Sequence, residues 1–165
     1  MVTRVAKLLL LASIALLYTL IVLDNLTDFD SNYQVVRHVL MMDSTFPGNH
    51  GMWRAVHQPL VHLTFYIGII AWESATTFLL WWGATVLFRA LRSSSTTFNA
   101  AKRVPVMALT LSLLMWLVAF LTIGANWFLM WQSRMWNGQP VAVEMFVVVG
   151  IVLLLMLQPE TEGQP

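Results

Sequence analysis

The sequence predicts an all-α membrane protein, with four transmembrane helices in an antiparallel bundle and a short external amphipathic helix between spans 1 and 2. Hydrophobic residues make up 58% of the 165-residue chain and charged residues only 10%. Four apolar runs approach or exceed the ~20 residues needed to cross ~30 Å of hydrocarbon. Because lipid cannot satisfy an exposed backbone amide or carbonyl, such runs must cross as helices. We therefore expect a single four-span membrane domain over residues 1–165.

The predicted spans cover residues 5–23, 60–88, 104–125 and 141–157. Charged side chains are rare within them: Lys7 in the first, Glu73 in the second and Glu144 near the start of the fourth. Pro105 falls just inside the third span, where its missing N–H costs nothing. The first span has the basic start of a secretory signal. Cleavage would leave too short an apolar region, so we expect an uncleaved anchor.

The connecting segments predict one further helix and one loop. Residues 24–59 and 126–140 are external, and residues 89–103 form a cytoplasmic link. The first external segment is too long for a simple connection, so it should be structured. Asp30 or Ser31 could cap a short helix running through Met42, with its apolar residues on one broad side. The Ser/Thr run of the link predicts a loop, in which Thr97 caps a turn leading into the third span.

Basic residues predict the orientation. With a cytoplasmic amino terminus, six lie inside and three outside, which favours both termini in the cytoplasm. The inside set is Arg4, Lys7, Arg89, Arg92, Lys102 and Arg103, and the outside set is Arg37, Arg54 and Arg134.

Several classes of activity find no support in the composition. The chain has no cysteine, which excludes disulfides, iron–sulfur clusters, thiolate zinc sites and cysteine nucleophiles. A net charge of +1 gives no sign of the basic surface that a nucleic-acid-binding protein needs. The sequence contains no phosphate-binding glycine loop, Ser/His/Asp triad or His-Glu-x-x-His motif. We therefore expect a non-enzymatic protein that contacts membrane lipids and either another membrane protein or further copies of itself.

Glu73 is the most informative single residue. An ionised side chain deep in a bilayer costs at least ~2.5–3.5 kcal/mol, so such residues are usually paired, protonated or functional. Thr77 lies one helical turn away, and Tyr18 and Ser112 could supply hydrogen bonds from other spans. The favoured interpretation is an intramembrane packing contact, and a contact to another subunit stays open. A proton-coupled carrier centred on Glu73 is a further alternative, although Glu144, the nearest other membrane acid, lies near the outer surface.

External histidines and methionines raise a different possibility, a membrane redox protein. Imidazole and thioether ligands suit copper without any cysteine, and four-helix bundles can host haem. His57 and His62 would not face one iron, so haem would need His62 and a histidine from elsewhere. No cofactor is the first expectation. Candidate copper ligands are His38, His50, Met41, Met42 and Met52, and candidate haem ligands are His38, His57 and His62.

Tryptophans mark the external segments and suggest an interaction face. Trp127 and Trp131 lie one helical turn apart, and Trp53 and Trp136 occupy the same side of the predicted membrane. Aromatic residues concentrate at bilayer interfaces, which accounts for most of them. Long aromatic external segments also frequently bind a partner protein or a lipid headgroup.

Six segments of the sequence carry a resemblance to a known family: NLTDFDSN (25–32), VRHVLMMD (36–43), FPGNH (46–50), MWR (52–54), AWE (71–73) and WFLMWQSRMWNGQ (127–139). On these segments the chain resembles the bacterial predicted small integral membrane proteins, a family of unknown function. The resemblance implies a four-span protein of the bacterial inner membrane and implies no activity, cofactor or catalytic residue. The sequence favours an accessory or assembly subunit, or an oligomeric scaffold.

Overall fold

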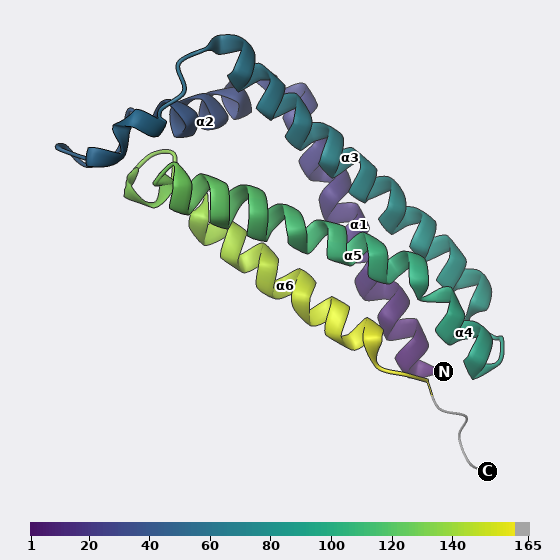
Figure 1. Cartoon of the computed structure of the whole chain (residues 1–165). Helices are drawn as coiled ribbons and strands as arrows, with labels where there is room; N and C mark the ends of the chain where they lie inside the picture. The colour runs from purple at the N-terminus through teal and green to yellow at the C-terminus, as the bar shows by residue number, and fades with distance from the viewer. Residues whose placement is uncertain (161–165) are drawn as a thin grey trace.

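The computed structural model describes residues 1–160, which form helices and no strand. Four helical segments within this part of the chain are long and apolar enough to cross a membrane: α1 (Val2–Thr27), α3 (Pro59–Ala90), Ser95–Trp127 and α6 (Gln139–Leu157). They run side by side in an elongated bundle, with the amino terminus and the end of α6 at the same end (Figure 1). We refer to this as the terminal end, and to the end near α2 as the loop end. The predicted four-span, all-α fold is confirmed.

A second helix follows α1 almost without a break. α1 continues past the predicted limit at residue 23 to Thr27, and the Asp28 N–H donates to Asp24 O at 2.8 Å. α2 (Phe29–Met41) then occupies the segment in which a short helix is predicted. Neither Asp30 nor Ser31 caps it, because both lie inside its first turn. Met42 ends the helix in the left-handed conformation, with φ of 54°. The short helix η1 (His50–Arg54) leads from there into α3.

The third membrane segment contains three elements. The Ser/Thr run predicted as a loop begins the helix α4 (Ser95–Ala101), whose N-cap is Ser94 rather than Thr97. Ser94 Oγ accepts from the Thr97 N–H at 3.2 Å. α5 (Arg103–Leu114) follows, and η2 (Met115–Trp127) continues it as a π-helix. In η2 the Phe128 N–H donates to Ile123 O, five residues earlier, at 2.9 Å. The short helix η3 (Met130–Gln132) leads toward α6.

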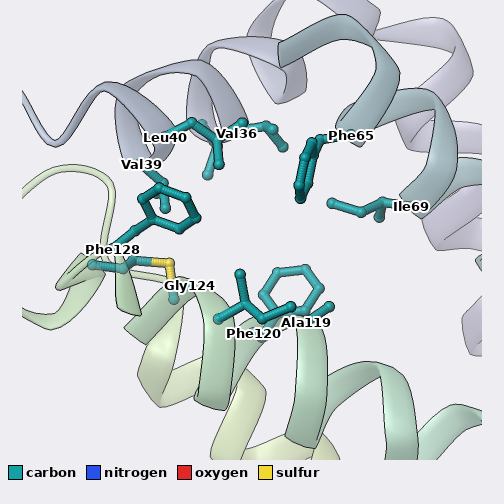
Figure 2. Close-up of a pocket in the computed structure, with 12 residues that line it drawn as sticks. Val36, Val39, Leu40, Phe65, Ile69, Ala119, Phe120, Gly124 and Phe128 are labelled. Atoms are coloured by element: carbon teal, nitrogen blue, oxygen red, sulfur yellow. The ribbon is translucent and has the colours of Figure 1, made fainter. Parts of the chain in front are cut away.

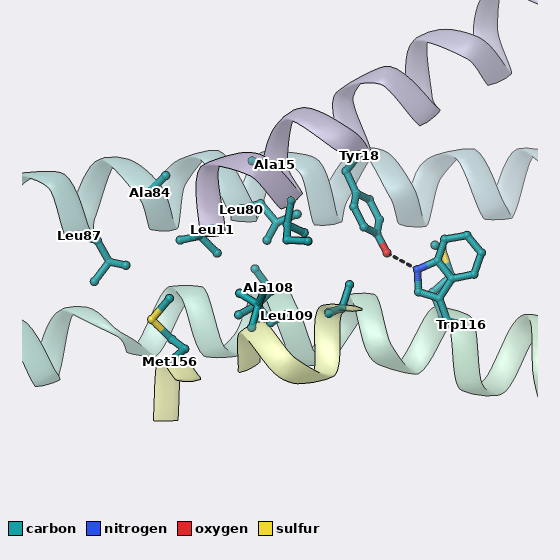
Figure 3. Packing of buried hydrophobic residues seen from close by; sticks show 14 of the residues in the cluster. Leu11, Ala15, Tyr18, Leu80, Ala84, Leu87, Ala108, Leu109, Trp116 and Met156 are labelled. Carbon is teal, nitrogen blue, oxygen red and sulfur yellow. Dashed lines mark hydrogen bonds between the residues drawn. The ribbon is translucent and has the colours of Figure 1, made fainter. Parts of the chain in front are cut away.

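The core lies between α1, α3, α5 and α6 and contains one buried hydrogen-bonded group (Figure 3). Trp116 Nε1 donates to Tyr18 Oη at 2.7 Å, and Tyr18 Oη is also hydrogen-bonded to Ser112 Oγ. All three side chains are buried. Where α3 meets α5, a Cβ placed on Gly83 would lie 3.1 Å from the Pro105 ring, so the two backbones approach closely there.

The start of α1 and the residues that follow α6 meet at the terminal end. Lys7 Nζ donates to Gln158 O at 2.7 Å and forms a 2.6 Å ion pair with Glu160. Lys102 Nζ donates to the same Gln158 carbonyl at 2.6 Å. Arg4 donates to Ser93 O at 2.7 Å, which joins α1 to the turn after α3. The terminal end is therefore held by charge-assisted hydrogen bonds as well as by apolar packing.

We expect Glu160→Gln to lower stability by about 1–3 kcal/mol at neutral pH, because Lys7 loses its charged partner in a largely buried place. Burial alone would raise the pKa of Glu160, but the hydrogen bond and charge of Lys7 outweigh it and lower that pKa. The stabilisation is therefore complete above the ordinary glutamate pKa of about 4.3 and is lost as the pH falls through the lowered value. Thermal unfolding in detergent would be measured from pH 7 to pH 3 for the unaltered protein and the Glu160→Gln variant. Their midpoint temperatures should converge at acid pH. A difference that is independent of pH would contradict this account.

Candidate functional site

Glu73 lies at the centre of a polar network at the loop-end side of α1. Its side chain is almost fully buried, and Asn25 Nδ2 donates to Glu73 Oε2 at 2.7 Å. Tyr66 Oη donates to Asn25 O at 2.9 Å and to Asn25 Oδ1 at 3.1 Å. Thr77, the predicted neighbour, donates its hydroxyl to the Glu73 backbone carbonyl and not to the carboxylate. Asn25 therefore holds one carboxylate oxygen and is itself positioned by Tyr66.

The network places Glu73 near the edge of the apolar layer rather than at its centre. Asn25 belongs to the last turns of α1 and lies beyond the apolar run that ends at residue 23. It is about 16 Å along the helix from Ile14, the midpoint of that run, at 1.5 Å per residue. That distance is about half of a ~30 Å hydrocarbon layer. A charge at this level costs less than it would at mid-bilayer.

The other predicted intramembrane contacts form a separate group. Tyr18 and Ser112 hydrogen-bond to each other, and Tyr18 also accepts from Trp116. Sequence reasoning missed Asn25 and Tyr66 as the partners of Glu73. One signal was present: Asn25 is the second polar residue after the first apolar run.

A cavity of about 540 Å³ opens beside this network. It lies between the end of α1, α2, α3, η2 and the start of α6. Its polar lining comes from Asp24, Asn25, Asn32, Tyr66 and Glu73. Asn32 Nδ2 donates to Asp24 Oδ2 at 3.1 Å. The lining contains two carboxylates, and none of the described residues that line it is Lys, Arg or His.

A second, apolar pocket of about 90 Å³ adjoins the first (Figure 2). Side chains of α2 and α3 face those of η2 and Phe128 across it. Both hollows are lined by Val35, Val36, Ile69 and Phe120. Because four residues border both, the two hollows are neighbouring parts of one space with a polar and an apolar end. The π-helix lines both parts, in keeping with the frequent occurrence of π-helical segments at functional sites.

The structure separates the four histidines into different surroundings. His38 Nδ1 lies 2.7 Å from Asp43 Oδ2, and the His38 ring stacks on Trp136 with centroids 4.5 Å apart. His62 is buried, and its Nε2 is hydrogen-bonded to Val56 O at 2.8 Å. His50 and His57 are exposed. Within residues 1–160, no three His, Cys, Asp or Glu side chains gather in a metal-ligand arrangement.

The methionines named as copper ligands are also divided. Met42 is buried and Met41 partly buried, whereas Met52 is exposed. Met52 Sδ accepts a weak hydrogen bond from Thr45 Oγ1 at 3.6 Å. The three side chains therefore lie in different environments.

Three of the predicted face tryptophans come from two segments of the chain, η1 and the region from the end of η2 to η3. Trp53 and Trp127 meet edge to face with centroids 5.8 Å apart. The Arg54 guanidinium lies 5.3 Å from the Trp127 ring centroid and 5.9 Å from that of Trp53. Trp131 meets Phe46 at 5.7 Å. Trp53, Trp127 and Trp131 are substantially exposed, so the loop end presents an aromatic surface.

A family model described as predicted small integral membrane protein (DUF2165) matches residues 3–159, nearly the whole chain. The chain belongs to this family. The four apolar helices agree with the family's description as integral membrane proteins, and the description names no reaction, ligand or partner. Neither a curated protein nor a solved structure matches the chain. For this member of the family, the case for a particular role therefore depends on its own residues.

Proposed function

We propose that this family member is a non-catalytic assembly component of the bacterial inner membrane, either an accessory subunit or an oligomeric scaffold. In this proposal both termini are cytoplasmic, since the basic residues concentrate at the terminal end. The loop end, including α2, then faces outward. The observation that carries the proposal is a face of α3 that turns away from the bundle.

Small side chains form this face of α3. Thr64, Gly68, Ala71 and Ala75 are all exposed, and their spacing of four, three and four residues places them on one side of the helix. A Cβ placed on Gly68 would meet no atom of this chain within 4 Å. Association of helices in lipid depends on close backbone approach, so small residues are enriched where transmembrane helices meet. We define Thr64, Gly68, Ala71 and Ala75 as the assembly face.

Aromatic side chains extend the same face toward the terminal end. Phe78 and Trp82 continue its spacing, are exposed, and lie 5.9 Å apart by ring centroid. A partner helix could therefore pack closely against the small residues and contact the two rings farther along. The exposed tryptophans of the loop end offer a second contact area outside the apolar layer.

The absence of native cysteine allows a direct test by crosslinking. We expect Ala71→Cys, labelled with a maleimide-linked photo-crosslinker, to form crosslinks in native membranes, because a partner helix covers it. Ile151→Cys on α6 is the matched control, since Ile151 is also an apolar, exposed residue of a membrane-spanning helix. A crosslinked product of twice the molecular mass would identify a homo-oligomer. A product that contains a different protein, found by mass spectrometry, would identify the partner subunit. Equal crosslinking at the two positions would refute the proposed face.

A second variant tests the packing itself. A Cβ added at Gly68 has open space around it and the residue is exposed, so Gly68→Leu should leave the fold unchanged. The added side chain would hold the partner helix away, and crosslinking through Ala71→Cys should fall at least tenfold. Undiminished crosslinking with Gly68→Leu would show that the partner contacts another surface.

A further inference from the structure

The cavity beside Glu73 has one carboxylate oxygen that the protein leaves without a donor. Asn25 Nδ2 occupies Oε2, and no described residue donates a hydrogen bond to Oε1. The Glu73 side chain is only 2% exposed, and it lines the cavity. A nearly buried carboxylate with a free oxygen facing a cavity would be stabilised by a donor or a cation supplied from outside.

The charges around the cavity select the sign of such a ligand. Asp24 and Glu73 bring two carboxylates, while the described lining includes no basic side chain. These carboxylates would therefore repel an anion and attract a cation. The side-chain oxygens of Asn25 and Asn32 add hydrogen-bond acceptors to this lining.

Aromatic rings complete the polar part of the space. Tyr66, Trp116 and Phe120 line it together with the two carboxylates. A ring face attracts an ammonium group by about 0.5–2 kcal/mol, and more strongly where water is excluded. Carboxylates combined with aromatic rings suit an ammonium group better than a compact hydrated metal ion, which requires a full shell of oxygen ligands.

The apolar part of the space would receive a hydrocarbon chain. Beyond Ile69 and Phe120 the lining is entirely apolar and includes Val39, Phe65 and Phe128 (Figure 2). Each methylene removed from water there contributes about 0.8 kcal/mol. An amphiphile could thus place its head beside Glu73 and its tail between α2, α3 and η2.

We propose that this space is a binding site for an amphiphile that bears an ammonium group, with the ammonium between Glu73 and Asp24 and the hydrocarbon chain in the apolar pocket. The ammonium could belong to a free alkylamine or to the ethanolamine headgroup of a phospholipid. The site is independent of the assembly face, because Ile69 and Glu73 point into the bundle whereas Gly68 and Ala71 point away from it.

Equilibrium dialysis of the full-length protein in maltoside micelles tests the site, with protein-free micelles subtracted. The probe is labelled octyltrimethylammonium, compared with octanol and octanoate. We expect the protein to bind the cation at least tenfold more tightly than octanoate. Glu73→Gln should weaken cation binding at least tenfold and leave octanol binding unchanged. Glu144→Gln, at an exposed acid outside the cavity, is the matched control.

Two further arms complete the experiment. Ile69→Trp would fill the junction of the two hollows and should abolish the gain in affinity from tetramethylammonium to octyltrimethylammonium. Displacement of the probe by dioctanoyl phosphatidylethanolamine would identify the lipid as the source of the ammonium, and lack of displacement would identify a free amine. Equal binding by the Glu73→Gln and Glu144→Gln variants would overturn the proposal. If Glu73→Gln misfolds on size exclusion, octanoate binding by the unaltered protein as tight as cation binding would overturn it.

Discussion

Gly83→Leu should prevent α3 and α5 from packing and give one of the two largest losses of stability expected for this bundle. A Cβ at Gly83 would already lie 3.1 Å from Pro105 Cδ, Cγ and backbone N. A leucine extends well beyond that point, and the proline ring cannot turn aside. Overpacking costs typically 1–3 kcal/mol and occasionally more. Because the added side chain would meet the Pro105 backbone, we expect a cost of about 3 kcal/mol or more.

Gly150→Leu is the matched control for this experiment. Both glycines lie inside apolar helices, but a Cβ at Gly150 meets nothing within 4 Å. The gain in helix propensity, roughly 1 kcal/mol relative to glycine, is common to both variants and cancels. Monodispersity on size exclusion and the thermal midpoint in detergent would be compared. A Gly83→Leu protein as stable as Gly150→Leu would mean that the two helices do not meet as described.

Tyr18→Ala should destabilise the protein by at least as much. Removing a fully buried aromatic ring costs about 3–5 kcal/mol. The change also leaves Trp116 Nε1 and Ser112 Oγ without their shared partner inside the bundle. Tyr18→Phe removes the hydroxyl alone and should cost about 1–2 kcal/mol, because both orphaned groups are buried.

Tyr33→Phe is the control for Tyr18→Phe, because it also removes a tyrosine hydroxyl but from a different environment. Tyr33 lies on α2, is partly exposed, and its hydroxyl takes part in no hydrogen bond among the described residues. Its variant should stay within ~0.5 kcal/mol of the parent protein. Unfolding of each variant would be followed by circular dichroism in the same detergent. Equal stability of the Tyr18→Phe and Tyr33→Phe proteins would contradict a structural role for the Tyr18–Trp116–Ser112 group.

Spans are predictable from this sequence because length and hydropathy alone determine them. The elements between the spans depend on weaker and competing signals. The Ser/Thr run reads as a loop, yet Ser94 caps α4 there. Nothing in a predominantly apolar run such as 115–127 distinguishes a π-helix from an α-helix, because no continuous polar face fixes the period of the pattern.

The site was only half predictable, for a related reason. Glu73 is conspicuous as an acid inside an apolar run, but apolar runs give no register between neighbouring helices. Its partner Asn25 lies just beyond the first run, and the pairing depends on how far α1 slides along α3. The pocket needs the position of α2 as well, which no spacing in the sequence supplies. The functions of the histidines, the methionines and the loop-end tryptophans stay predictions.

The contact between Lys7 and Glu160 also bears on how the protein is made. A chain is synthesised from its amino terminus, so α1 enters the membrane long before α6 exists. The partners of Lys7, the Gln158 carbonyl and Glu160, leave the ribosome only after the fourth span has been synthesised. Until then α1 is joined at the terminal end through Arg4 to the turn after α3, and Lys7 has no partner. Completion of this bundle is therefore tied to completion of translation through the fourth span, and a chain that stalls earlier leaves the Lys7 ammonium without its carbonyl and carboxylate partners.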